Sequence, residues 1–143
     1  MNTLGSFETV SLPQFGVKNV IAKVDTGAYS GALHCTDIHI VRKGLNRKRY
    51  LQFTPLGEPA LASETDKFLK TYIRSATGHR IQRFIIDTSI TIQGKSYPIR
   101  IGLSDRSDMK RAVLIGRRFL RENEMLVDVR INQELDDEGE LTK

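Results

Sequence analysis

The 143-residue chain is poor in cysteine, lacks tryptophan and contains no long hydrophobic run. Its single cysteine, Cys35, excludes an internal disulfide and is typical of a compartment that keeps thiols reduced. No apolar run approaches the ~20 residues that a membrane-spanning helix needs, and residues 1–9 lack the basic and then apolar profile of a signal peptide. We therefore expect a cytoplasmic protein with no membrane partner.

Basic residues outnumber acidic ones, and the excess is unevenly spread. The net charge is +5 at pH 7, from 22 Lys and Arg against 17 Asp and Glu. Residues 133–143 hold five of the acids and one lysine, so residues 1–132 carry 21 bases and 12 acids, a net charge of +9. Such a body attracts acidic peptides and other polyanions, although the same bases could simply solvate the surface. Without tryptophan the sequence offers no evident stacking platform, which argues against nucleic acid as the partner.

Short β-branched runs separated by turn signals predict a mostly-β protein. The length allows one domain, which we expect over residues 1–132, followed by an acidic, disordered tail over 133–143. Residues 55–65, with two prolines, are expected to form a loop. The expected strands are 7–12, 16–24, 33–41, 50–54, 68–75, 80–87, 89–92, 97–103 and 125–131, with one short C-terminal helix over 116–124.

The most informative motif is Asp25-Thr26-Gly27-Ala28, which directly follows the apolar residues Val20, Ile21, Ala22 and Val24. Aspartic peptidases present their acid in this way, as a carboxylate at the end of a buried strand before a hydroxyl residue and a glycine. Asp-Thr-Gly alone also occurs in ordinary turns. Far downstream, however, the apolar triplet 113–115 leads into Gly116-Arg117 and the expected helix, and retropepsins place these two segments in the same order.

The whole chain is similar to the RimB-like family, whose members are also labelled RimK-associated or ATP-dependent zinc proteases. The similarity covers roughly residues 10–130. It implies a retropepsin-like closed β-barrel and an aspartic endopeptidase that processes the glutamate-extended tail of a ribosomal protein. The matching blocks are residues 22–28, 30–34, 78–80, 83–86, 105–109, 113–117 and 126–128.

Hydrolysis of an amide by carboxylates needs two of them: the ionised one takes a proton from water, and the protonated one donates to the carbonyl oxygen. In aspartic proteases the two carboxylates lie close enough to share one proton and cannot both ionise, so the pKa of one rises and the pKa of the other falls. The chain contains one Asp-Thr-Gly motif. The similarity therefore implies a homodimer in which the catalytic Asp25 of each chain meets its counterpart on a two-fold axis.

The similarity also implies roles for the residues around Asp25. Thr26 would donate a hydrogen bond across the dimer, and Gly27, which lacks a Cβ, would let the substrate backbone approach. Ala28 completes the active-site loop, and Gly116 would lie close behind it.

Arg117 occupies the position at which retropepsins brace the active site through an acidic partner. Viral members place that partner shortly after Asp-Thr-Gly-Ala, where this chain has Tyr29 and Ser30, so the partner of Arg117 is left open. Asp128 could pair with Arg117 or with Arg118, and it is a poor candidate for a second catalytic acid.

A retropepsin also needs a flap that closes over the substrate. The hairpin over residues 75–84 fits by its place between the two active-site segments. Its tip carries Gly78, His79 and Arg80, and such a basic tip would suit an anionic substrate. An ordinary exposed hairpin could carry the same residues.

Metal and nucleotide sites are not supported by the spacing of candidate residues, so we expect no cofactor. His34 and His39 are five residues apart and point to opposite faces of a strand, and there is no His-Glu-x-x-His motif. Gly94-Lys95-Ser96 resembles the end of a phosphate loop but is explained by a hairpin turn. Residues 105–109 could be an acidic binding loop or a capped turn. A non-catalytic module that binds acidic peptides and, less favoured, a zinc protease are the alternative functions.

Overall fold

The computed structural model describes residues 2–74 and 76–136, and strands dominate this part of the chain. Its one α-helix is short, with six residues. The strands are β1 (Thr3–Leu4), β2 (Phe7–Leu12), β3 (Val17–Val24), β4 (Gly31–Lys43), β5 (Lys48–Pro55), β6 (Ser63–Thr65), β7 (Phe68–Arg74), β8 (Arg80–Ile92), β9 (Lys95–Ser104), β10 (Val113–Ile115) and β11 (Leu126–Val127); the helices are η1 (Pro13–Phe15), η2 (Pro59–Leu61), α1 (Arg117–Glu122) and η3 (Gln133–Leu135).

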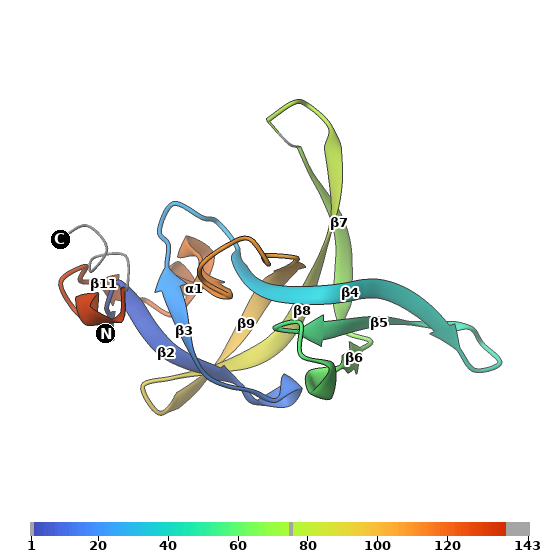
Figure 1. The fold of residues 1–143 in the computed structure, drawn as a ribbon, viewed down its shortest axis with the longest axis horizontal. Coiled ribbons are helices and arrows are strands. Elements are labelled where there is room, and N and C mark those ends of the chain that lie inside the picture. The colour runs from blue at the N-terminus through green and yellow to red at the C-terminus, as the bar shows by residue number, and fades with distance from the viewer. Residues whose placement is uncertain (1, 75, 137–143) are drawn as a thin grey trace.

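Six strands close a barrel in the order β3, β2, β8, β9, β4 and β10. Figure 1 shows how the longer strands of the barrel, β2, β3, β4, β8 and β9, are arranged. Closure depends on the short strand β10, which runs parallel to β3, with Val113 opposite Ala22, and antiparallel to β4, with Val113 opposite Leu33. A closed barrel pairs the strand edges that an open sheet would expose. The predicted mostly-β, retropepsin-like barrel with one short helix is confirmed.

The apolar residues of the barrel strands form one buried core together with residues of β1, β5 and η1. Phe53 is almost fully buried and meets Phe15 of η1 edge to face, with ring centroids 5.0 Å apart. This geometry is the preferred one for aromatic pairs. The other large, fully buried side chains are Leu4, Leu12, Leu33, Leu51, Ile86, Ile90, Ile92, Ile101 and Ile115.

The β7–β8 and β4–β5 hairpins project from the barrel in different directions (Figure 1). The pair β7–β8 remains in register from Phe68 opposite Ile86 to Arg74 opposite Arg80, as expected for the hairpin over 68–87. The pair β4–β5 ends in the basic turn around residues 44–47. Strand β8 then continues without a break to Ile92, although the sequence predicted two shorter strands.

The predicted closing strand over residues 125–131 is wrong for most of its length. Strand β11 contains two residues and pairs in parallel with β1, which the sequence did not predict. After β11 the side chain of Asp128 accepts a hydrogen bond from the backbone N–H of Arg130 at 3.0 Å, and the Ile131 N–H donates to the Asp128 carbonyl at 3.0 Å. This Asx-type turn overrides the β-branched composition.

The expected loop over 55–65 contains the 3-10 helix η2 and strand β6, which pairs with β5. At the other end of the chain, η3 lies beside β2 because Asn132 Nδ2 donates to the Phe7 carbonyl at 2.8 Å. Residues 137–143, where most of the predicted disordered tail falls, lie outside the described residues. None of the helices in the described chain is long and apolar enough to cross a bilayer.

Candidate active site

Asp25 lies directly after β3, at the point where β10 ends beside it. Its backbone N–H donates to the carbonyl of Ile115 at 2.8 Å, so the parallel pairing of the two strands continues into the active-site loop. The loop then turns back: the Gly27 N–H donates to Asp25 Oδ1 at 3.0 Å and the Ala28 N–H to the Asp25 carbonyl at 3.2 Å. The half-buried carboxylate is thereby oriented by its own loop, and the next residue, Thr26, is exposed.

Gly116 packs against the far side of this loop. A Cβ at position 116 would lie 2.6 Å from the Tyr29 carbonyl oxygen and 2.7 Å from the Ser30 carbonyl carbon, closer than real contacts allow. The first residues of α1 are then within reach of the loop: the Arg117 N–H donates to the Ala28 carbonyl at 2.8 Å. The structure thus brings together the two segments that the sequence placed about ninety residues apart.

Arg117 braces the loop without an acidic partner in the described chain. Its Nη1 donates to the Gly27 carbonyl at 3.0 Å, and its guanidinium lies 5.3 Å from the centre of the Tyr29 ring, a cation–π distance. Asp128 pairs with Arg130 at 2.9 Å, and not with Arg117 or Arg118, which the sequence had offered as possible partners. Tyr29, which the sequence showed only as a departure from the viral pattern, belongs to the site.

A cavity of about 510 Å³ opens beside Asp25. Most of its lining comes from β3 and from the segment that joins β9 to β10. Four bases line it: Lys23, Arg106, Lys110 and Arg111. The sequence had placed Lys23 and Arg106 in blocks shared with the family but had assigned none of the four a substrate-binding role, although Lys23 and Asp25, two residues apart on an extended chain, share a face. The lining residues are Phe7, Lys23, Asp25, Arg106, Asp108, Met109, Lys110, Arg111, Leu114 and Asp136.

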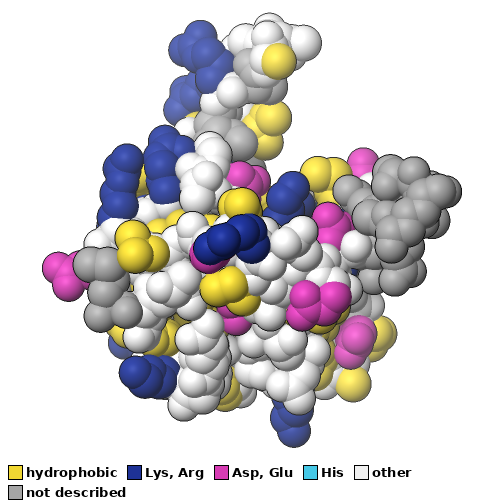
Figure 2. All heavy atoms as spheres, turned by 90° about the vertical axis from the view of Figure 1, so that its left-hand side faces the viewer, with side chains coloured by type: hydrophobic (Ala, Val, Ile, Leu, Met, Phe, Trp, Pro, Cys, Tyr) yellow, Lys and Arg dark blue, Asp and Glu magenta, His cyan; other side chains and the backbone are white. Residues whose placement is uncertain are grey.

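The tip residues of the β7–β8 hairpin do not line that cavity. Gly78 has φ +86°, which suits a glycine in a tight turn, and His79 follows it. The Arg80 guanidinium lies 4.3 Å from the centre of the Tyr72 ring. The hairpin stands clear of the barrel and carries basic side chains along one side (Figure 2). Its role as a flap remains a prediction.

The other chemically reactive side chains are held in structural roles. Cys35 is fully buried, and burial raises the pKa of its thiol to about 12. The Arg106 N–H donates to His34 Nδ1 at 2.8 Å, and His39 Nδ1 lies 2.8 Å from the Asp37 carbonyl oxygen. Within the described ranges, no three His, Cys, Asp or Glu side chains come together as a metal site would require.

Two segments that the sequence left open are turns. Asp105 Oδ1 accepts hydrogen bonds from the Ser107 N–H at 2.9 Å and from its hydroxyl, and these bonds lower the pKa of the Asp105 carboxyl. The capped-turn interpretation of residues 105–109 is therefore confirmed. Gln93 and Gly94 both have positive φ and form the tip of the β8–β9 hairpin, as the hairpin explanation of Gly94-Lys95-Ser96 requires.

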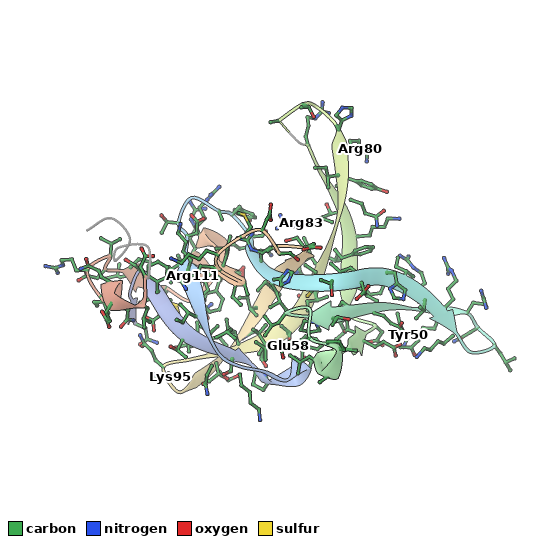
Figure 3. The ribbon with its side chains drawn as sticks, in the orientation of Figure 1. Tyr50, Glu58, Arg80, Arg83, Lys95 and Arg111 are labelled. Atoms are coloured by element: carbon green, nitrogen blue, oxygen red, sulfur yellow. The ribbon has the colours of Figure 1, made fainter. Side chains whose placement is uncertain are left out.

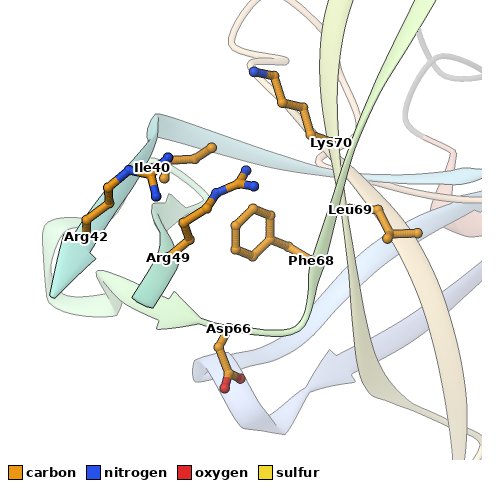
Figure 4. A pocket seen from close by; sticks show the side chains of 7 residues that line it. All are labelled: Ile40, Arg42, Arg49, Asp66, Phe68, Leu69 and Lys70. Carbon is orange, nitrogen blue, oxygen red and sulfur yellow. The ribbon is translucent and has the colours of Figure 1, made fainter. Parts of the chain in front are cut away.

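A second hollow, of about 610 Å³, lies between the β4–β5 arm and the base of β7 (Figure 4). The guanidinium of Arg49 lies 5.5 Å from the centre of the Phe68 ring, and Asp66 pairs with Lys48 at 2.9 Å. This hollow shares no lining residue with the cavity at Asp25. It is lined by Ile40, Arg42, Arg49, Asp66, Phe68, Leu69 and Lys70.

A six-stranded closed barrel, with Asp-Thr-Gly at the end of one strand and a Gly-Arg helix start packed behind it, defines the retropepsin-like fold. The family model described as "Retropepsin-like aspartic endopeptidase RimB" matches residues 3–136. The chain therefore belongs to the RimB-like family, and the predicted family is confirmed.

Curated relatives are longer proteins. A probable alpha-L-glutamate ligase of Desulfotalea psychrophila is 25% identical over 98% of this chain and 30% of its own length. A protein with the same name from Shewanella pealeana is 26% identical over 96% of this chain and 31% of its own length. The chain thus spans less than a third of these relatives. Among solved structures, Lpg0085 of Legionella pneumophila, a protein of unknown function, has the same fold, with a TM-score of 0.67, 24% identity and coverage of 91% of this chain and 95% of that one.

Proposed function

We propose that the chain is one half of a homodimeric aspartic endopeptidase, in which Asp25 of each protomer supplies one carboxylate. The observation that carries this proposal is the Asp25 loop itself. Its carboxylate is fixed by the Gly27 N–H, while the loop is held from behind by Arg117 through the Gly27 carbonyl. One chain supplies one such carboxylate, and hydrolysis of an amide needs two.

Exposed apolar side chains near the loop support the dimer. Leu126 and Val129 are more than half exposed, and a cavity of about 480 Å³ beside Leu126 also includes Thr26. Figure 2 views the side of the molecule that carries β11 and shows hydrophobic side chains among charged ones. The β1–β11 sheet has two strands within the described chain, and the Gln93 side chain already donates to the Thr3 carbonyl on β1, so the outer edge of β11 is the one that a second chain can extend.

In the proposed dimer, the two Asp25 carboxylates share one proton across the two-fold axis. The ionised carboxylate accepts a proton from the attacking water, and the protonated one donates to the carbonyl oxygen of the scissile bond. The carboxyl that took the proton from water then passes it to the leaving nitrogen, and the other carboxylate takes back a proton from one hydroxyl of the tetrahedral intermediate. The carbonyl re-forms as the C–N bond breaks, and the dyad again holds one proton. The Gly27 N–H holds the Asp25 carboxylate in place and so reduces its reorganisation during these transfers.

An acidic substrate fits the charge of the molecule. Residues 1–132 carry +9, and four of the residues that line the cavity at Asp25 are basic. The longer relatives are named as glutamate ligases, and in them a region like this chain is part of one polypeptide. We therefore propose that the substrates are proteins with glutamate-extended tails, and specifically a ribosomal protein with such a tail. The proposed compartment is the cytoplasm.

The test is cleavage of a glutamate-tailed peptide and a neutral peptide by wild type and by Asp25→Asn. Asp87→Asn is the matched control, because Asp87 pairs with Arg100 on the β8–β9 ladder and lies outside both the cavity at Asp25 and the one beside Leu126. We expect Asp25→Asn to lose activity while remaining folded and dimeric in sedimentation, and Asp87→Asn to retain activity. Equal cleavage by wild type and Asp25→Asn would refute the assignment. Loss of wild-type activity in a chelator would favour the zinc protease instead.

A further inference from the structure

Arg111 lines the cavity beside Asp25 and is largely buried. Its side chain is 12% exposed, and its guanidinium is 5.0 Å from the centre of the Phe7 ring. Figure 3 shows it beside the end of β3 that leads to Asp25. Because a guanidinium packed on an aromatic ring has lost much of its rotamer freedom, it is preorganised to bind a ligand.

The groups that Arg111 contacts are those of an acidic peptide. Its Nη2 donates to the backbone carbonyl of Leu135 at 2.7 Å and lies 3.8 Å from Oδ1 of Asp136. A backbone carbonyl followed by the carboxylate of the next residue is what any peptide with an acidic residue presents. The chain's own segment at 135–136 therefore presents to Arg111, next to Asp25, the same groups that an acidic peptide would present.

Two further bases extend this recognition. Lys23 is exposed, faces the same cavity and has no acidic partner among the residues the structure describes. Arg106 donates through Nε to the Arg111 carbonyl at 3.1 Å, which places a second guanidinium in the lining. The acids in this lining are Asp25, Asp108 and Asp136, and Asp136 belongs to the segment that Arg111 holds.

We propose that Arg111, with Lys23 and Arg106, forms the subsite that binds an acidic side chain of the substrate beside the scissile bond. Asp136 occupies this subsite in the free protein and is displaced when substrate binds. The proposal rests on the proposed function in one respect, that the cavity at Asp25 is the substrate site. It goes further by naming the residues that select a carboxylate and the internal group that competes for them.

All binding measurements use the Asp25→Asn background, so that cleavage does not interfere. The probes are a labelled tetraglutamate peptide and a labelled tetraglutamine peptide of the same length, and binding is followed by their fluorescence anisotropy. Lys23→Gln and Arg111→Gln should each weaken tetraglutamate binding about 10-fold, as expected for a lost charge-assisted contact. Tetraglutamine binding should not change. Arg111→Lys, which keeps the charge and loses the planar fork, should fall in between.

Lys95→Gln is the matched control, because it removes one positive charge at the tip of the β8–β9 hairpin, away from the cavity (Figure 3). Its effect should be less than about 2-fold, as expected for screened charge at a distance. Asp136→Asn should tighten tetraglutamate binding several-fold, because the internal competitor is weakened. Lys23 is exposed, so the outcome at position 23 remains informative even if an Arg111 variant fails to fold.

If Lys23→Gln and Lys95→Gln weakened tetraglutamate binding equally, the proposal would be overturned, because the overall charge would then explain the binding. It would also be overturned if Lys23→Gln weakened the binding of tetraglutamate and of tetraglutamine by the same factor. Cleavage assays run in parallel separate the two hypotheses. A wild type that binds tetraglutamate through Lys23 and never cleaves it contradicts the peptidase and leaves the subsite standing.

Discussion

Replacement of Gly116 by alanine tests how tightly the two active-site segments are packed. The new Cβ would lie 2.6 Å from the Tyr29 carbonyl oxygen, so relief to an ordinary contact of 3.4 Å requires a shift of about 0.8 Å. The Arg117 N–H to Ala28 carbonyl bond, now 2.8 Å, would lengthen beyond hydrogen-bonding distance. Overpacking costs about 1–3 kcal/mol and each lost hydrogen bond about 1 kcal/mol, which gives a total of about 2–4 kcal/mol.

Such a loss corresponds to a fall in Tm of about 6–12 °C for a domain of this size. The assay is thermal unfolding followed by circular dichroism at one fixed protein concentration, since a dimer would make Tm depend on concentration. Gly94→Ala is the control: nothing lies within 4 Å of its Cβ, so it reports only the strain of its φ of +77°, about 1 kcal/mol. A Gly116→Ala protein as stable as Gly94→Ala would refute the packing argument.

Further predictions concern other groups of the described chain. Arg117→Lys should cut kcat more than 10-fold with little change in KM in a peptidase assay, because lysine cannot both donate to the Gly27 carbonyl and cover the Tyr29 ring in the same way. Hydrogen bonds from Arg130 lower the pKa of the Asp128 carboxyl from 3.8 to about 2. Because the folded-state pKa is lowered, the ionised carboxyl stabilises the fold above pH 4, and this contribution is lost as the pH falls towards 2. In Asp128→Asn, the free energy of unfolding measured in urea should therefore depend less on pH between 4 and 2. Native Cys35 should not react with a thiol reagent at pH 8 until the protein is unfolded, because burial raises its thiol pKa to about 12.

The strands were predictable where the alternation of apolar and polar residues is regular. The hairpins at Gly78 and Gly94 carry their own turn signals, and both are present. The end of the strand predicted over residues 125–131 could not be predicted, because the side chain of Asp128 caps a turn there. The β-branched composition of this segment does not reveal such a hydrogen bond. Parallel pairing between the two-residue strands β1 and β11 also lacks a local signal, since their partners are far apart in sequence.

The sequence predicted the order of the active-site motifs along the chain, but it did not predict all the side chains that meet at the site in space. Asp25, Gly116 and Arg117 follow a known order, and the structure brings them together. The ring of Tyr29 beside Arg117 is a contact between side chains that spacing alone does not give. Arg111 could not have been chosen from 22 basic residues, because its place in the cavity depends on how the segment before β10 folds over β3.

The central claim is that two chains share one active site, and mixing wild-type and Asp25→Asn chains tests it most directly. The chains are combined at several ratios, unfolded and refolded together or coexpressed, and peptidase activity is measured at fixed total protein. If a site needs Asp25 from both protomers, activity falls with the square of the wild-type fraction, to about one quarter at an equal mixture. A linear fall, to about one half, would show that each chain acts alone and would contradict the shared site.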